Sequence, residues 1–229
     1  MKYDKNYVLT LVRHAESCGN AGIFYEDEYQ KDDPPLSPLG LKQAELLAQS
    51  KLLENADVIF SSTLIRAVQT VYPSAQKIGK NIILLSDLME INTEIPGTEY
   101  SRLNDNFPLA VACISEPTPT GGPLLLGKET NELIAKRAER CINFFADYAS
   151  DGSHIAVITH GSYFGFLVRA ALDIAFPESF CWQVDNCSVT RIVFRKNEIP
   201  KLAFSNYTGH LFQEPIFPSF TQFNQEVVK

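Results

Sequence analysis

Short apolar runs rich in β-branched residues alternate with amphipathic helical patterns along most of this chain of 229 residues. The apolar runs have the length and composition of buried strands, while the segments between several of them carry apolar residues at helical spacing. Strands that alternate with helices are typical of a mostly parallel sheet whose two faces are covered by helices. We therefore expect an α/β fold, namely a three-layer α/β/α sandwich with a mostly parallel central sheet.

Local patterns set the expected boundaries of these elements. Ser37 followed by Pro38 predicts a helix start, because serine is a common N-cap and proline fits the first helical turn. We expect helices over residues 38–53, 64–78, 129–148 and 163–172. The expected strands cover residues 7–12, 57–60, 81–85, 155–159, 188–194 and 201–204.

One long stretch fits neither pattern. Periodicity dissolves between residues 93 and 128, and residues 116–123 have the sequence EPTPTGGP. Such a stretch inside a compact domain is typical of an insertion or lid outside the core. Because no internal repeat or separate linker is present, we expect a single domain over residues 1–229 with one lid-like insertion, about 93–128. The tail after residue 212 is expected to pack on the surface.

Charge and hydropathy narrow the function classes. The formal net charge of −7 disfavours a nucleic-acid binder, because no basic excess is available to replace the counterions of phosphates. The apolar stretch at residues 7–12 is too short for a signal peptide. Residues 164–176 are interrupted by Arg169 and Asp173, so no membrane span is expected. The oligomeric state is not readable from these patterns. We expect a cytoplasmic protein without a membrane partner.

Residues suited to phosphate binding follow the first expected strand, where residues 13–20 have the sequence RHAESCGN. The Arg13 guanidinium offers a planar fork of donors for phosphate oxygens, and the Asn20 amide can donate as well. The His14 imidazole is a nucleophile that can attack phosphorus. The alternative is that Arg13 pairs with a surface carboxylate and that His14 is a hydrogen-bonded loop residue.

Two further segments place similar side chains after other expected strands. Residues 61–70, SSTLIRAVQT, put Arg66 at a helix start, where the helix N-terminus itself favours anions. Residues 159–161, THG, put His160 at the end of an apolar strand, and Gly161 lets the backbone approach a ligand closely. Taken singly, such an arginine is more often solvated and such a histidine more often structural. The carboxyl ends of the strands are, however, where open α/β sheets bind their ligands.

Together these segments resemble the histidine phosphatase superfamily, also called the phosphoglycerate mutase-like family, over nearly the whole chain. Its first motif, R-H-G-E-(S/T)-x-x-N, is similar to residues 13–20, with Ala15 in place of the usual glycine. Residues 32–44, DDPPLSPLGLKQA, are similar to the segment that follows in the family. SSTLIRAVQT resembles its second arginine motif, and THG supplies its second histidine. The matched positions of the first motif are Arg13, His14, Glu16, Ser17 and Asn20.

The resemblance implies that His14 is the nucleophile and forms a phosphohistidine. Cationic donors around it suit phosphoryl transfer, because the transition state spreads negative charge over three oxygens. His14 must attack with a neutral ring nitrogen, so its other nitrogen is expected to donate to a nearby acceptor. The substrate-binding residues that the resemblance implies are Arg13, Asn20, Arg66, His160 and Gly161.

The leaving oxygen needs a proton, and the resemblance points to a carboxylic acid in an L-x-E motif, which is Glu90 in this chain. A bound phosphate dianion favours the protonated form of a nearby glutamate, although arginines act in the opposite direction. The alternative is a surface glutamate at a strand end. Residues 91–100, INTEIPGTEY, also depart from the G-x-x-E-G that many relatives have here, so Glu94 and Glu99 are rival acids.

No metal site and no cofactor are expected. Two of the histidines lie beside arginines in the expected site, and cationic neighbours disfavour a divalent cation. His154 precedes a strand and His210 lies near a C-terminal aromatic cluster, so both are expected to be structural or solvated. The cysteines lack CxxC spacing and are expected to be free thiols. They are Cys18, Cys113, Cys141, Cys181 and Cys187.

We therefore interpret the chain as a metal-independent phosphomonoesterase for a small phosphorylated substrate. The first alternative is a phosphoglycerate-type mutase, but residues 93–128 lack the arginine-rich segments of cofactor-dependent mutases and contain Arg102 and Lys128 as their only basic residues. The second alternative is a non-catalytic phosphate-binding regulatory module, whose signature would be loss of the nucleophile. The expected insertion would cover the site and select the substrate.

Overall fold

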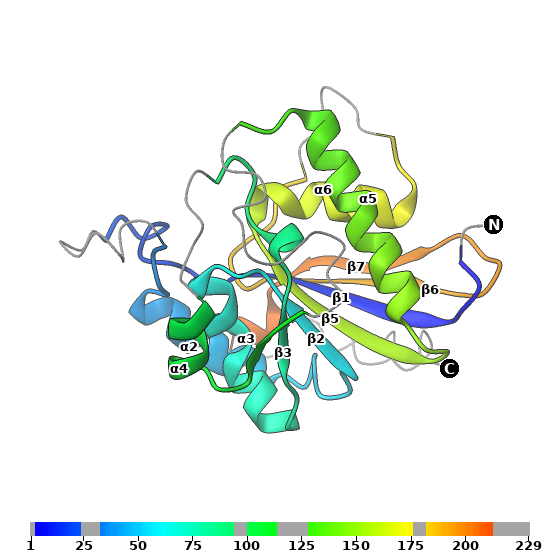
Figure 1. Cartoon of the computed structure of the whole chain (residues 1–229). Helices are drawn as coiled ribbons and strands as arrows, with labels where there is room; N and C mark the ends of the chain where they lie inside the picture. Colours follow the sequence, from blue (N-terminus) through cyan, green and yellow to red (C-terminus); the bar gives the residue numbers. More distant parts are fainter. Residues whose placement is uncertain (1–2, 24–32, 94–99, 114–127, 176–181, 213–229) are drawn as a thin grey trace.

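The computed structural model describes residues 3–23, 33–93, 100–113, 128–175 and 182–212. Its strands are β1 (Tyr7–Arg13), β2 (Val58–Ser61), β3 (Ile82–Leu84), β4 (Ala110–Ala112), β5 (Ser153–Thr159), β6 (Val189–Phe194) and β7 (Lys201–Tyr207). They form a seven-stranded sheet in the order β4-β3-β2-β5-β1-β6-β7 (Figure 1). The pairs from β4 to β1 are parallel, while β6 is antiparallel to both β1 and β7. The mostly parallel sheet predicted from the sequence is confirmed.

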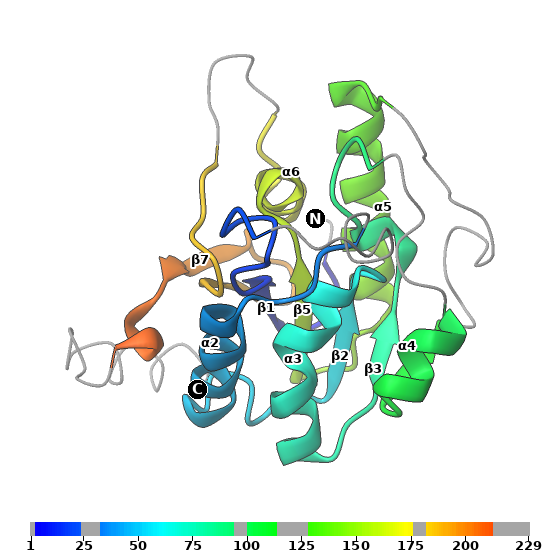
Figure 2. The same cartoon turned by 90° about the vertical axis from the view of Figure 1, so that its left-hand side faces the viewer.

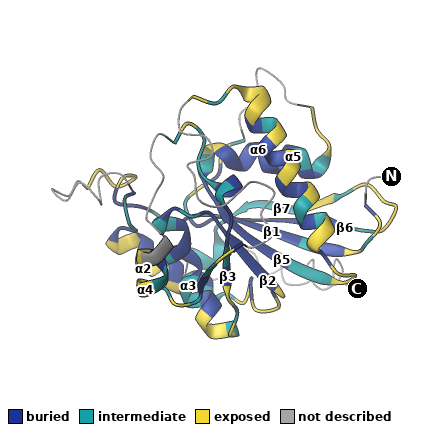
Figure 3. Cartoon of the chain, viewed as in Figure 1, coloured by how far each residue is buried: buried dark blue, intermediate teal, exposed yellow. Residues whose placement is uncertain are grey.

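Helices cover both faces of this sheet: α2 (Pro38–Gln49), α3 (Ile65–Ile78), α4 (Tyr100–Asn106), α5 (Asn131–Tyr148) and α6 (Gly161–Leu172). α5 and α6 pack over one face in a core that includes Leu11 of β1, and the other helices share a second core with Val12 (Figure 2). Successive strand residues point to opposite faces, so each strand serves both cores. Figure 3 shows the buried sheet between helices whose outer faces are exposed. The expected three layers are confirmed.

Local chemistry sets the helix ends near the strands' carboxyl edge. The Ser37 hydroxyl accepts a hydrogen bond from the Gly40 amide at 3.0 Å, and Pro38 is the first residue of α2, as expected. α2 ends earlier than expected because Lys51 has a φ of 63°, a left-handed conformation that does not continue a helix. A side chain at Gly40 would overlap the Glu16 backbone, so glycine lets α2 begin directly against the loop after β1.

The expectation that residues 93–128 stand outside the core is wrong for residues 100–113. This part forms α4 and β4, and β4 extends the sheet in parallel beside β3. Leu103 and Ala110 are buried in the core. Three residues of strand and one short polar helix are too brief to show a period, which is why the pattern carried no signal. Residues 94–99 and 114–127 lie outside the described residues, so the lid over the site stays a prediction.

Other expectations concern the membrane, the thiols and the tail. Among the described residues, no helix has the length and apolar character needed to cross a membrane. The cytoplasmic location and the absence of a nucleic-acid partner stay predictions. The cysteines in the described part of the chain are buried thiols without a disulfide bond, as expected, whereas Cys181 and the tail after residue 212 lie outside it.

Candidate active site

Two histidines meet where neighbouring parallel strands end. Arg13 is the last residue of β1 and pairs in register with Thr159, the last residue of β5. His14 and His160 follow directly, and the His14 amide donates to the Thr159 carbonyl at 2.9 Å. The ring centroids of the two histidines are 5.1 Å apart, and both side chains are buried. The sheet thus brings together two motifs that lie far apart in the sequence.

The hydrogen bond of His14 fixes how its ring can react. Its Nδ1 lies 2.7 Å from the Ala15 carbonyl oxygen, which can only accept, so Nδ1 carries the proton. Burial lowers the pKa of His14 well below its usual range, and the charges of Arg66 and Arg13 lower it further. The ring is therefore neutral near pH 7, with a lone pair on Nε2. The acceptor that the sequence could not identify is the backbone of the next residue.

His160 is held by a residue that the sequence patterns do not single out. Its Nε2 lies 2.7 Å from the Ser62 hydroxyl, and the oxygen of that hydroxyl accepts a hydrogen bond from the Leu64 amide at 3.2 Å. Burial and the charge of Arg66 hold the pKa of His160 well below its usual range. Its Nδ1 is buried and has no hydrogen-bond partner among the described residues. Ser62 follows the end of β2, so the strand-end rule that identified His160 would also have identified it.

Arg13 lies against the first turn of α6. Its Nη1 donates to the Val184 carbonyl at 2.6 Å, and its Nε is buried with no partner in the described part of the chain. A Cβ at Gly161 would lie 3.0 Å from that Nε, so the glycine makes room for the guanidinium. Gly161 therefore lets the Arg13 side chain lie close to the backbone at the start of α6.

Arg66 enters the site from the first turn of α3, as expected, and it has a buried partner. Its Nη1 lies 3.4 Å from Oδ1 of Asp33, whose side chain is 2% exposed. The other carboxylate oxygen of Asp33 accepts from the Ile65 amide at 2.9 Å, so the acid holds both the helix start and the arginine. Asp33 lies in the segment 32–44 that resembles the family, but no pattern in the sequence relates it to Arg66.

The loop before β6 closes another side of the site. Asn186 donates through Nδ2 to the His14 carbonyl and to Oδ1 of Asn20, both at 3.1 Å. Oδ1 of Asn20 also accepts from the amide and hydroxyl of Ser17, at 3.2 and 3.0 Å. The NH₂ group of Asn20 is therefore the end that can donate to an anion. Asn186 was missed because only the antiparallel direction of β6 brings its start to this edge.

Glu90 lies beside the same group of residues. Its carboxylate accepts from the Ile91 amide at 2.9 Å and from the Ser162 and Tyr163 amides of α6 at 3.2 and 3.0 Å. Its charge raises the pKa of Arg13 against the effect of burial, and it does the same for Arg66. The rival acids Glu94 and Glu99 lie outside the described residues.

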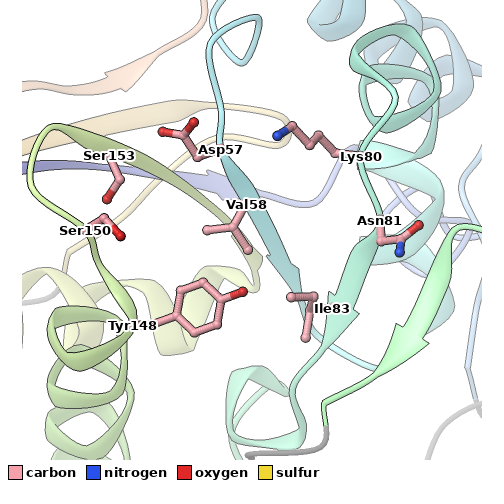
Figure 4. Close-up of a pocket in the computed structure, with 8 residues that line it drawn as sticks. All are labelled: Asp57, Val58, Lys80, Asn81, Ile83, Tyr148, Ser150 and Ser153. Atoms are coloured by element: carbon pink, nitrogen blue, oxygen red, sulfur yellow. The ribbon is translucent and has the colours of Figure 1, made fainter.

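His154 and a surface hollow lie away from this site. His154, at the amino end of β5, has its Nε2 2.8 Å from the Thr10 hydroxyl. His210 lies in a short 3₁₀ helix, Gly209–Leu211, with its ring tilted against that of Tyr207 at a centroid distance of 5.9 Å. A hollow of about 220 Å³ opens at the amino ends of β2, β3 and β5, with Lys80 and Tyr148 at its edge (Figure 4). Among the described residues, no group of three or more histidine, cysteine or acidic side chains could hold a metal ion.

His154 makes the free energy of unfolding depend on pH in the acidic range. Burial lowers its pKa from 6.5 to about 4, so between these values the unfolded state binds more protons than the folded state. We expect stability to fall as pH drops through this window, by up to about 3 kcal/mol from this residue. Urea unfolding of wild type and His154→Gln between pH 7 and 4 measures the effect, because the other histidines cancel in the difference. Parallel pH curves would contradict the assignment.

The chain is similar to several known proteins. The sequence model of the histidine phosphatase superfamily (branch 1) matches residues 9–207. "Phosphoserine phosphatase 1" of Hydrogenobacter thermophilus is 28% identical over 211 residues, covering 90% of this chain and 96% of that protein. "Probable phosphoglycerate mutase GpmB" of Photorhabdus laumondii is 29% identical over 189 residues, covering 81% and 84%. A solved phosphoserine phosphatase from Entamoeba histolytica, in complex with 3-phosphoglyceric acid, shares the fold with a TM-score of 0.57 at 24% identity, covering 90% and 100%.

Proposed function

Because this chain belongs to the histidine phosphatase superfamily, we propose that it is a phosphomonoesterase that works through a phosphohistidine on His14. One observation carries the proposal, namely that the neutral His14 ring donates from Nδ1 to a backbone carbonyl at 2.7 Å. This bond leaves the Nε2 lone pair for attack on phosphorus. Arg13, Arg66 and His160 surround that ring with donors for the phosphoryl oxygens.

The reaction takes two balanced steps. First, Nε2 of His14 attacks phosphorus while the bond to the ester oxygen breaks, and that oxygen takes a proton from the Glu90 carboxyl. Second, the oxygen of a water molecule bonds to phosphorus while the bond between phosphorus and Nε2 of His14 breaks. Glu90 takes a proton from this water, and inorganic phosphate leaves. The two arginines stabilise the charge that develops on the equatorial oxygens in both steps.

The position of Glu90 and the charge of the substrate both suit a proton donor. Three backbone amides donate to its carboxylate and fix its orientation. A bound phosphate dianion favours the protonated form of a nearby carboxyl group through like-charge repulsion. Glu90 is therefore the acid we propose, protonated in the substrate complex.

The proposed chemistry needs no metal ion. The nucleophile is an imidazole, and the charge of the phosphoryl group is met by guanidinium groups that would repel a divalent cation. The Asn20 amide adds a neutral donor, and Gly161 keeps the space that Arg13 occupies.

We propose a small phosphate monoester as the substrate, because one relative by sequence and one similar solved structure are both named as phosphoserine phosphatases. A phosphoglycerate-type mutase is the second candidate, favoured by the name of another relative. A non-catalytic module is disfavoured because His14, both arginines and His160 are all present. The two imidazole rings are 5.1 Å apart, and the charges of both arginines act on His14.

We expect the protein to release phosphate from p-nitrophenyl phosphate and phosphoserine at undiminished rates in excess chelator, since no step uses a metal. Phosphate release, measured colorimetrically, checks this. Lys80→Ala, in the hollow of Figure 4, is a control that should turn over like wild type. Activity that vanishes in chelator and returns with a divalent metal would contradict the metal-free mechanism. Interconversion of phosphoglycerates without phosphate release would favour the mutase.

A further inference from the structure

A buried arginine lies behind the segment that carries Glu90. Arg137 of α5 is 2% exposed, and its Nη1 donates to the Asp87 carbonyl at 3.1 Å and to the Met89 carbonyl at 2.7 Å. Residues 87–90, which we call the acid segment, form no part of the sheet. Two of their backbone carbonyls are thus fixed by one side chain from a rigid helix.

A carboxylate holds this arginine in one orientation. Nε and Nη2 of Arg137 donate to the two oxygens of Glu129, at 3.0 and 2.7 Å. Both side chains of the pair are buried. A planar two-point pair of this kind fixes the guanidinium plane, and its neutralised charge lowers the cost of burial. The direction in which Nη1 points is therefore set by Glu129.

The same guanidinium also contacts the helix that binds the Glu90 carboxylate. Its carbon atom lies 4.0 Å from the ring centroid of Tyr163 in α6. The Tyr163 amide donates to Oε1 of Glu90 at 3.0 Å. α5 and α6 pack against each other on this face of the sheet (Figure 1). Arg137 therefore joins the backbone before Glu90 to the helix start that orients its carboxylate.

We propose that Arg137, oriented by Glu129, is a positioning residue that holds Glu90 at the oxygen of the leaving group. This inference rests on the proposed function, because it gives Glu90 a proton to deliver. Arg137 touches neither substrate nor reacting atoms, so its loss would displace the acid and leave His14 and the phosphate-binding arginines in place. Since proton transfer needs heavy atoms within hydrogen-bond distance, a small shift of the acid segment is enough to impair it.

The test compares leaving groups. An alkyl alcohol leaves poorly without a proton, whereas p-nitrophenolate leaves well as an anion. We expect Arg137→Lys, which keeps the charge but loses the two-point pair, to lower kcat/KM for phosphoserine by at least about tenfold more than kcat/KM for p-nitrophenyl phosphate. The ratio of kcat/KM values is the right readout because it reports steps up to phosphohistidine formation and ignores its hydrolysis. Glu90→Gln should change the ratio in the same direction and further.

Arg191→Lys is the matched control. Arg191 is also a buried arginine that donates to a backbone carbonyl, that of Leu52 at 2.8 Å, but it does so from β6 and toward the chain that follows α2. We expect this variant to lose stability without changing the ratio. An equal loss for both substrates in Arg137→Lys would overturn the proposal and show a structural role. If that variant does not fold, Glu129→Gln gives the same test. Absence of turnover in the wild type would count against the proposed function instead.

Discussion

Replacing His14 by alanine is expected to abolish turnover, with a loss of about 10⁴-fold or more in kcat. The variant keeps both arginines and His160 but has no nucleophile for phosphorus. It should still bind phosphate, because the groups that meet the phosphoryl oxygens come from other residues. We also expect wild-type protein quenched during turnover to carry a phosphoryl group on His14, detected by mass spectrometry under alkaline conditions, and the variant to carry none.

His154→Ala is the matched control for this experiment. It removes a histidine at the amino end of β5, whereas His14 follows the carboxyl end of the neighbouring parallel strand β1. We expect it to retain wild-type kcat at neutral pH, so that a loss specific to His14→Ala cannot be assigned to a general loss of histidine. Phosphate release by His14→Ala at the wild-type rate would show that another residue is the nucleophile. Retained labelling of the variant would show the same.

The geometry around His14 could be predicted largely because each motif follows a strand. Parallel neighbours end at the same edge, so the strand ends alone place His14 beside His160. The register Arg13 to Thr159 then makes the two histidines neighbours in space. Arg66 was predictable for a related reason, since its helix begins shortly after β2 ends. Short-range patterns therefore sufficed wherever a residue was fixed by its own strand or helix.

The parts that could not be predicted from the sequence depend on distant partners. Asp33 acquires its role from a pairing with α3, and no local pattern distinguishes it from a surface acid. Asn186 reaches His14 because β6 runs antiparallel to β1, a direction that strand patterns do not encode. β4 was likewise not predictable, because its three residues form a strand through their place beside β3. Tertiary context decides such positions.

Loss of Arg66 should have the second-largest effect on catalysis. Its guanidinium is a charged donor beside the nucleophile, and removal of one such donor from a transition state costs about 10²–10³-fold. We expect Arg66→Ala to lower kcat/KM by this amount. Burial is the main reason that the pKa of His14 is low, and Arg66 is the next. In the variant the pKa of His14 should rise, so the acidic limb of the pH profile of kcat/KM should move to higher pH.

A double variant separates this catalytic effect from the stability of the fold. Arg66→Ala alone leaves the buried Asp33 carboxylate without the Arg66 guanidinium, which should cost about 3 kcal/mol of unfolding free energy. In Asp33→Ala/Arg66→Ala the carboxylate is removed together with the guanidinium, so part of this stability should return in urea unfolding. Catalysis should stay low, because the missing charge belongs to the transition state and not to the ion pair. Recovery of kcat/KM together with stability would mean that Arg66 stabilises the fold and has no role in catalysis. Arg13 and His160 would then be sufficient to stabilise the negative charge of the phosphoryl group.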